Sequence, residues 1–415
     1  TNMPLLRFFG DRRPADLARE IEEIIQVLEQ HDTVVRGDML RDAFRFAREV
    51  HAPQKRMDGQ PYIVHPVAVA RTCAEHWMTD AGVMAALLHD TIEDADKSLA
   101  LTEEMLARRF GPDVAHLVAG VTKLKKDLAE KGLDPRVETL KKLLHATASE
   151  DLRIVILKIF DRCENVKTLG VFREDKRMRI GEETMRFYVP VADRLGFYGA
   201  ARQMEDAVFM ALQPKEHARI AEWVEAERKR KAPEMAKQIE GVKRELADMG
   251  IDAVDRFQAR GLFSIHRLAQ QPDGSVDVAG LQDVPVFDLC FIVPDVDACF
   301  RVLNVVHRRF RYHAESVRDF INNPKINGYQ SLHTIVRGPD ASRITVISRT
   351  SDMEWRNRFG VIGDLRSGRA HEGAFLHDLV ESFDIINGAE LLDLTGRLFF
   401  AEIDVTTPAG HGVKL

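Results

Sequence analysis

Four side chains capable of metal binding or acid–base chemistry stand within six residues, at His89, Asp90, Glu93 and Asp94. They follow an apolar helical run, and at about 100° per residue they span an arc of about 140°, so all four can face one cavity. An imidazole beside a carboxylate suits a borderline or hard divalent ion. The two following carboxylates suit orienting and deprotonating a water molecule. The alternative is an ordinary capped or salt-bridged helix end, so further ligands must come from elsewhere in the chain.

Asp161 is a second candidate ligand, because it directly follows the apolar stretch 152–160 (LRIVILKIF). That stretch predicts a buried helix or else a strand. A carboxylate at its end costs several kcal/mol of desolvation unless it is paired or coordinates a metal. Arg162 is one candidate partner. Asp161, Asn165 and Thr168 also fall at i, i+4 and i+7, and this polar stripe indicates a metal ligand adjoining a base-recognition pocket.

Two further segments carry ambiguous signals. Residues 55–66 (KRMDGQPYIVHP) form a Gly/Pro turn that leads into a helix over 67–74, with His65 at its entrance. Taken alone, His65 is typical of a packed helix-entry histidine and Arg56 of a solvated surface arginine. Lys123 stands in a cluster with Lys125 and Lys126, which is either solvated or faces a phosphate.

Composition limits the class of protein. The 415 residues predict two or three domains. A hydrophobic content of 45% with 30% charged residues is typical of a globular protein in water. The net charge of −6 gives no global attraction to nucleic acid, so any polyanion site must be a local basic patch.

The four cysteines are scattered without CxxC spacing, which predicts a reducing, cytoplasmic setting and no zinc knuckle. The sequence has no long uninterrupted apolar span, so we expect no membrane partner. Because the sequence starts at Thr1 and stops in mid-pattern at Leu415, we expect it to be trimmed from a longer protein.

The order of predicted elements indicates a helical part followed by an α/β part. Helical periodicity recurs from residue 14 to 250, ending in a long charged helix or pair of helices over 214–250, with no convincing strand. From about 251 the pattern changes. We expect strands at 284–293, 334–337 and 343–347, a helix over 296–310 and another over 374–387, and short strands at 397–400 and 403–405.

Taken together, these segments resemble the RelA/SpoT homologue family, the long (p)ppGpp hydrolase/synthetases. The motifs that carry the resemblance are PYIVHP with Arg56 nine residues before His65, LLHDTIEDAD, EDLRIVILKIFDRCENVKTL, VPVADRLG, LFSIHR, FDL, NPKINGYQSLHT and SRT. The closing TGRLFFAEIDVTTPAGHGVKL resembles the start of that family's TGS module.

The resemblance implies a role for each candidate in the first domain. His65, His89, Asp90 and Asp161 match the ligands of one Mn²⁺ ion, and a His₂Asp₂ site with open positions suits that ion. The resemblance also implies roles in catalysis and nucleotide binding: Glu93 and Asp94 match the pair that orients and deprotonates water, Arg56 a guanine contact, Asn165 and Thr168 base and ribose contacts, and Lys123 a phosphate contact. The implied reaction removes the 3′-diphosphate of ppGpp or pppGpp, releasing pyrophosphate and GDP or GTP.

The second domain departs from the family's synthetase pattern. Where the family has a Gly-Arg-x-Lys phosphate grip, residues 257–260 read FQAR. Asp288 is kept, but the arginine that should follow is Cys290, and the second metal-binding carboxylate falls at Thr345. Phosphoryl transfer needs metal-holding carboxylates and cationic clamps. We therefore interpret this domain as a pseudo-synthetase whose remnant nucleotide pocket comprises Ser264, Arg267, Asp288, Tyr329 and His333.

The predicted architecture is multidomain. Residues 1–200 would form an all-helical HD-type hydrolase domain, 201–250 a helical linker, 251–370 an α/β, mixed-sheet nucleotidyltransferase-like pseudo-synthetase domain, and 371–415 a connecting helix with a truncated TGS-like start. The expected partners are guanine nucleotides; ribosome or tRNA would be reached only through C-terminal regions beyond this chain. Two alternatives stay open: a bifunctional synthetase/hydrolase, and a nucleotide-sensing regulatory protein.

Overall fold

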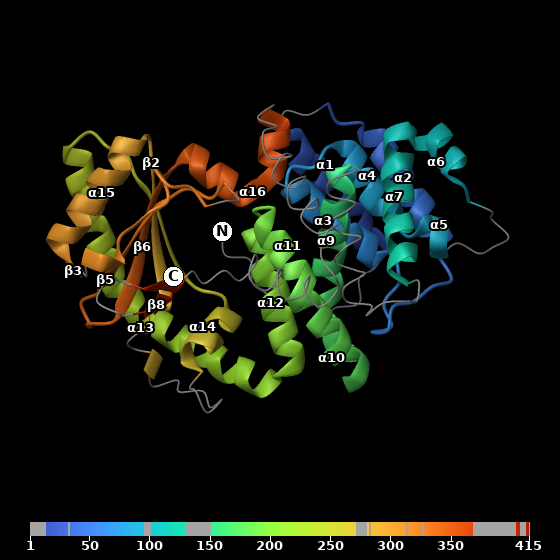
Figure 1. The fold of residues 1–415 in the computed structure, drawn as a ribbon. Helices are drawn as coiled ribbons and strands as arrows, with labels where there is room; N and C mark the ends of the chain where they lie inside the picture. Colours follow the sequence, from blue (N-terminus) through green and yellow to red (C-terminus); the bar gives the residue numbers. More distant parts are fainter. Residues whose placement is uncertain are drawn as a thin grey trace. The chain divides into compact units, whose positions relative to one another are not determined.

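Figure 1 shows a computed structural model of the chain. It describes residues 14–31, 34–94, 101–129, 151–270, 280–281, 284–312, 314–325, 328–367, 404–406 and 412–414. Contacts divide the chain into two compact units, Thr1–Val171 with Ser367–Leu415, and Phe172–Arg366.

The first unit is helical up to residue 171. Its elements there are α1 (Pro14–Glu29), α2 (Gly37–Val50), α3 (Val64–Glu75), α4 (Asp80–Leu88), α5 (Thr91–Asp94), α6 (Glu103–Phe110), α7 (Pro112–Ala129), α9 (Leu152–Val166) and a 3-10 turn at Leu169–Val171. Within the described residues of this region there is one isolated bridge, between Lys55 and Pro61, and no strand. The predicted helical character is confirmed.

Two buried helices form the centre of this unit. Every residue of α4 is buried, and Thr79 caps it by accepting a hydrogen bond from the Gly82 N–H at 3.4 Å. The apolar stretch 152–160 is a helix rather than a strand, and it is the first part of α9. Asp151 caps α9 by accepting from the Arg153 N–H at 3.0 Å. Helix α9 contacts α3, α4 and α7, as expected of a helix that is apolar on nearly every side.

The second unit combines helices with one sheet. Its helices are α10 (Glu174–Glu183), a π-helical segment at Thr184–Tyr188, α11 (Val189–Arg194), α12 (Tyr198–Leu212), α13 (Pro214–Asp248), α14 (Leu262–Ala269), α15 (Val296–Arg309) and α16 (Ser351–Ser367). The predicted long charged helix is the single helix α13, which contains Pro233.

The sheet is mixed, as predicted. Its order is β1 (Val254–Ala259), β2 (Phe287–Val293), β6 (Arg343–Thr350), β5 (Leu332–Arg337) and β3 (Arg311–Tyr312), with β4 (Arg318–Asp319) also pairing β5. Strands β2 and β6 are parallel, and the other pairs are antiparallel. The core on one face joins apolar side chains of β2, β5 and β6 to α13 and α15.

The strands predicted at 284–293, 334–337 and 343–347 and the helix over 296–310 are confirmed with shifted ends, whereas β1, β3, β4, α14 and α16 were not predicted. Strand β1 is an edge strand whose residues are exposed or half-buried, so its sequence lacks clear alternation. The domain limits stay predictions. Residues 201–250, expected as a linker, include Phe209, Ile220 and Val224, which share an apolar cluster with Ile265 and Phe287.

Little of the predicted C-terminal module falls within the described residues. Strands β7 (Asp404–Thr406) and β8 (Gly412–Lys414) form an antiparallel pair. The predicted helix over 374–387 and the strand at 397–400 lie outside the described residues. All four cysteines are free and buried. Among the described helices, none combines the length and apolarity needed to cross a bilayer.

Candidate metal centre and nucleotide sites

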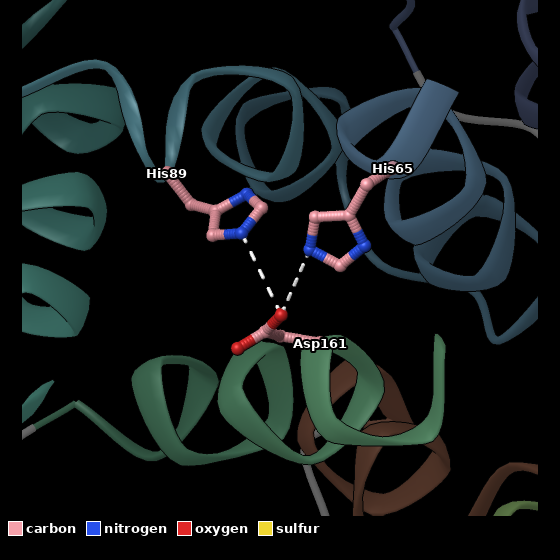
Figure 2. Close-up of side chains that lie close together, drawn as sticks. All are labelled: His65, His89 and Asp161. Atoms are coloured by element: carbon pink, nitrogen blue, oxygen red, sulfur yellow. Dashed lines mark hydrogen bonds and ion pairs between the residues drawn. The ribbon is translucent and has the colours of Figure 1, made fainter. Parts of the chain in front are cut away.

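Three separate segments bring His65, His89 and Asp161 together (Figure 2). His65 lies in the first turn of α3, His89 directly follows α4, and Asp161 lies on α9. One potential ligand atom from each lies within 4.8 Å of the others, and all three residues are buried. The His65 Nε2 atom is 3.0 Å from Asp161 Oδ1, and His89 Nε2 is 3.7 Å from the same oxygen.

The hydrogen bonds of His89 fix which ring nitrogen faces the cluster. Its Nδ1 lies 2.8 Å from the Ala86 carbonyl oxygen, which can only accept, so Nδ1 carries the proton. In a neutral ring, Nε2 then has a lone pair. That atom is buried without a hydrogen-bond partner and faces the carboxylate oxygens of Asp90 and Asp161. A hydrogen bond from the ring nitrogen that faces away from the ion to a carbonyl oxygen is typical of metal-binding histidines.

The electrostatics of the cluster favour a cation. Burial lowers the pKa of His89, but the carboxylates of Asp90 and Asp161 outweigh it and raise that pKa to about 10. Burial raises the pKa of Asp161, yet Lys158 and the two histidines hold it well below its usual range. The site therefore stabilises positive charge at the position between the imidazole and the carboxylates, and its nitrogen and oxygen donors fit a divalent ion.

Asp90, predicted as a fourth ligand, borders this cluster. Its Oδ2 atom lies 3.1 Å from His89 Nε2 and accepts a hydrogen bond from the Tyr62 hydroxyl at 2.7 Å. The Tyr62 contact was not predicted. A tyrosine in the Gly/Pro turn gives no sequence signal for it, because the contact depends on how that turn packs beside α4.

Lys158 is the polar residue of this site that sequence reasoning missed. Its Nζ donates to Asp161 Oδ2 at 2.6 Å, and both residues are buried. Arg162 was the partner considered from sequence, but i−3 on a helix also places Lys158 beside Asp161. Asn165 donates to the other oxygen of Asp161 at 2.6 Å. The carboxylate is thus held from both sides.

The predicted nucleotide contacts also lie close together. Arg56 donates to Thr168 Oγ1 at 3.0 Å, although the two residues are far apart in sequence. Thr168 in turn donates to the Asn165 carbonyl oxygen at 3.3 Å. Since Asn165 bonds Asp161, a continuous chain of contacts joins Arg56 to the metal-type cluster. The three residues of the predicted i, i+4, i+7 stripe, Asp161, Asn165 and Thr168, are therefore linked by hydrogen bonds.

The remaining residues predicted in the first domain lie on α5 and α7. Glu93 lies half-buried on α5, immediately after the His89–Asp90 pair. The backbone of Asp94 belongs to the same short helix, and its side chain lies outside the described part. Lys123 is exposed on α7.

In the second unit, Asp288 and Thr345 are direct neighbours on the parallel strands β2 and β6. Arg260, which directly follows β1, bridges them. Its Nε atom lies 3.1 Å from Asp288 Oδ1, and its Nη2 donates to Thr345 Oγ1 at 2.7 Å. Arg349 on β6 pairs with Glu354 at 2.7 Å. Both arginines are therefore engaged by acidic partners.

Tyr329 and His333 contact each other in the same unit. Their Oη and Nε2 atoms are 2.8 Å apart, and the tyrosine ring packs edge-on against Tyr198. Burial, with the positive charges of Lys325, Arg349 and Arg260, lowers the pKa of His333 to about 3. Ser264 is half-buried and Arg267 is exposed, and both lie on α14.

Comparison with protein families gives two matches. Residues 43–198 match the HD domain, and residues 262–367 match the region found in RelA and SpoT proteins. The first match contains the His65, His89 and Asp161 cluster, and the second contains Asp288, Tyr329 and Thr345.

Comparison with curated proteins finds several relatives of similar sequence. Over 409 residues the chain is 37% identical to a guanosine-3′,5′-bis(diphosphate) 3′-pyrophosphohydrolase of Aquifex aeolicus, covering 96% of this chain and 56% of that protein. It is 36% identical to the bifunctional (p)ppGpp synthase/hydrolase SpoT of Escherichia coli, covering 96% and 57%. It is 33% identical to a GTP pyrophosphokinase of Myxococcus xanthus, covering 90% and 50%. The chain spans about half the length of these relatives.

Proposed function

The chain belongs to the RelA/SpoT family, and from this premise we propose that it hydrolyses the 3′-diphosphate of ppGpp or pppGpp, releasing pyrophosphate and GDP or GTP. The observation that carries the proposal is the convergence of His65, His89 and Asp161 from three separate segments. Relatives named as (p)ppGpp hydrolases support the substrate class. The same relatives include proteins named for synthesis, so the activity of each domain is argued from its own residues.

The proposed metal is Mn²⁺, held by His65, His89, Asp161 and the bordering Asp90. His89 directs Nε2 at carboxylate oxygens of Asp90 and Asp161, and loss of the Nε2 proton to a competing ion would leave a lone pair there, which supports this ligand set. When bound, a divalent ion of this kind lowers the pKa of water and polarises a phosphoryl oxygen. Lys158 and Asn165 keep the Asp161 carboxylate in place.

The residues around the cluster divide the remaining tasks. Glu93, with Asp94, takes a proton from the attacking water. The water oxygen bonds to phosphorus, the bond from that phosphorus to the ribose 3′ oxygen breaks, and the 3′ oxygen receives a proton. Arg56 packs against guanine, while Asn165 and Thr168 contact base and ribose; their mutual contacts support one shared pocket. Lys123 contributes positive charge toward the phosphates.

The experiment that tests this proposal is incubation of the purified chain with ppGpp and Mn²⁺, with products resolved by anion exchange. Asp161→Ala should abolish metal-dependent release of pyrophosphate. Glu93→Gln should still bind Mn²⁺ but lose a factor of roughly 10²–10⁴ in turnover, the usual cost of removing a general base. Hydrolysis by Asp161→Ala at a near wild-type rate in EDTA would disprove the metal mechanism.

For the second unit we propose a pseudo-synthetase that regulates the hydrolase. Mg²⁺ commonly binds through one or two carboxylates in addition to the substrate phosphates. The strand neighbour of Asp288 is Thr345, which supplies no second carboxylate. Arg260 already neutralises Asp288. Tyr329 and His333 remain as nucleotide-type residues, and a nucleotide there could bias the hydrolase only by binding one of its states better.

Synthesis is tested with ATP plus GDP or GTP in the Glu93→Gln background, where the product is not destroyed. We expect no (p)ppGpp. Detectable synthesis that disappears on Asp288→Ala would contradict the proposal and favour a bifunctional enzyme. For the regulatory role, Tyr329→Ala should change the response of ppGpp hydrolysis to added GTP, and an unchanged response would remove its basis.

The domain limits belong to the same proposal. A hydrolase domain over 1–200 and a pseudo-synthetase domain over 251–370 agree closely with the matched regions, which end at 198 and begin at 262. A TGS-like module would start within 371–415, where the β7–β8 pair is compatible with a small β fold.

A further inference from the structure

Three arginines form a row across one end of the sheet of the second unit. Arg311 on β3 is the register partner of Arg337 on β5, and Arg337 is the register partner of Arg343 on β6. Residues directly opposite each other in antiparallel strands project to the same face of the sheet, and like charges in such positions destabilise it. We call Arg311, Arg337 and Arg343 the arginine row.

Nearby carboxylates do not neutralise this row. Asp340, in the turn between β5 and β6, pairs with Arg230 at 2.7 Å and Lys231 at 3.2 Å. Glu245 on α13 pairs with Arg309 at 2.6 Å. Within the described part of the chain, no carboxylate lies within 4.0 Å of a guanidinium nitrogen of the arginine row. The Nε atom of Arg343 is buried without a hydrogen-bond partner.

A cavity of about 350 Å³ adjoins two members of the row. Arg311, Arg337, Arg309 and Gln238 line it, together with Gly338 and Ala341 of the β5–β6 turn. The Arg337 side chain is oriented there, since its Nη1 donates to the Ala341 carbonyl oxygen at 3.0 Å. Arg311 is exposed and thus open to a ligand from solvent.

We propose that this cavity binds a polyphosphate group, either free or as the phosphate tail of a nucleotide. Guanidinium groups match phosphate oxygens through paired N–H donors, so arginine suits this recognition better than lysine. A bound polyanion would offset the repulsion within the arginine row. The net charge of the whole chain is −6, so this concentration of positive charge is local to the site. Neither the hydrolase cluster nor Asp288 contributes to it.

The test is calorimetric titration of the full chain with inorganic triphosphate in EDTA, which removes any divalent ion from the hydrolase cluster. The Arg311→Gln, Arg337→Gln double variant should bind at least about tenfold more weakly, because two charge-assisted contacts are lost. Arg308→Gln is the matched control. That exposed arginine is adjacent to Arg309 but pairs with Glu245 and does not line the cavity, so affinity should stay within about twofold of wild type.

Equal binding by the wild type and the double variant, or no binding by the wild type, would overturn the proposal. If circular dichroism shows that the double variant is misfolded, exposed Arg311→Gln alone replaces it and should still weaken binding. If the wild type binds GTP more tightly than inorganic triphosphate, and the double variant loses this preference, the ligand is the phosphate tail of a nucleotide. Equal affinities for the two identify free polyphosphate. If the wild type binds a single-stranded RNA, the double variant does not, and neither binds triphosphate measurably, the small-anion site is contradicted.

Discussion

Replacing Lys158 by methionine tests the electrostatic design of the metal cluster. Lys158 donates to Asp161 Oδ2 at 2.6 Å, and the lysine is only 8% exposed. Methionine keeps an unbranched, apolar stem of similar length in the buried helix, so the change removes mainly the charge. The other oxygen of Asp161 keeps its contacts to His65 at 3.0 Å and Asn165 at 2.6 Å. The carboxylate should therefore keep its position.

In the absence of metal, the variant should be less stable. Removing one partner of a buried ion pair typically costs 3–5 kcal/mol, and the two remaining contacts of Asp161 favour the lower end, about 3 kcal/mol. For a helical unit of this size that corresponds to a decrease of roughly 6–12 °C in the unfolding midpoint. Differential scanning calorimetry in EDTA measures the change directly.

In the presence of metal, the direction reverses. The Lys158 ammonium repels a cation at the cluster, and two unit charges at about 4 Å interact by about 4 kcal/mol at an effective dielectric constant of 20. Even a third of that, about 1.4 kcal/mol, is a tenfold change in affinity. Lys158→Met should thus bind Mn²⁺ about tenfold more tightly and recover most of its lost stability when Mn²⁺ is added.

The control is Lys167→Met at the C-terminal cap of the same helix. Lys167 pairs with buried Glu164 at 2.6 Å, a carboxylate outside the proposed ligand set. It should lower stability without changing the affinity for Mn²⁺. An unchanged midpoint for Lys158→Met in EDTA, or weaker Mn²⁺ binding than wild type, would refute this account of the cluster.

Two further substitutions test the fold and the nucleotide pocket. Gly196→Ala should lower the free energy of unfolding in urea by about 2 kcal/mol. Gly196 has φ +80°, and an added Cβ would lie 2.8 Å from the Gly360 Cα. The control Gly199→Ala, which has nothing within 4 Å of the added Cβ, should not lower it. Arg56→Ala should raise the KM for ppGpp about tenfold with little change in kcat, and Thr168→Val should give part of that effect. A fall in kcat alone would place Arg56 in the chemistry instead.

The sequence signals for the first site are mostly local. The spacing within residues 89–94 and the stripe from Asp161 follow from helix geometry. His65 was ambiguous alone, and only the resemblance to a family assigned it. What single-sequence reasoning could not supply is the packing of α3 against α9, which brings His65 within 3.0 Å of Asp161. Lys158 was missed for a different reason: cations stand at both i−3 and i+1 of Asp161, and the sequence does not show that Lys158 at i−3 pairs with the carboxylate.

The second unit was harder to predict, because its key contacts join residues remote in sequence. Strand β1 is a half-exposed edge strand without clear alternation, so periodicity gave no signal. Arg260 was considered as a phosphate clamp. In the folded protein it is bonded to Asp288 and Thr345, across the strand register between β2 and β6. No pattern along the chain encodes that register.

The ion pair between Arg260 and Asp288 bears on the proposed lack of synthesis. Asp288 is largely buried and needs a cation to offset its desolvation. Because residue 345 is threonine, Asp288 is the one negative charge of this residue pair, and a single carboxylate holds a divalent ion poorly. A single guanidinium matches that charge. Arg260 provides it and also donates a hydrogen bond to Thr345. A metal–nucleotide complex would have to break this ion pair before it bound Asp288. On the pseudo-synthetase proposal, Arg260→Ala alone should therefore not produce (p)ppGpp synthesis, because Thr345 still supplies no carboxylate.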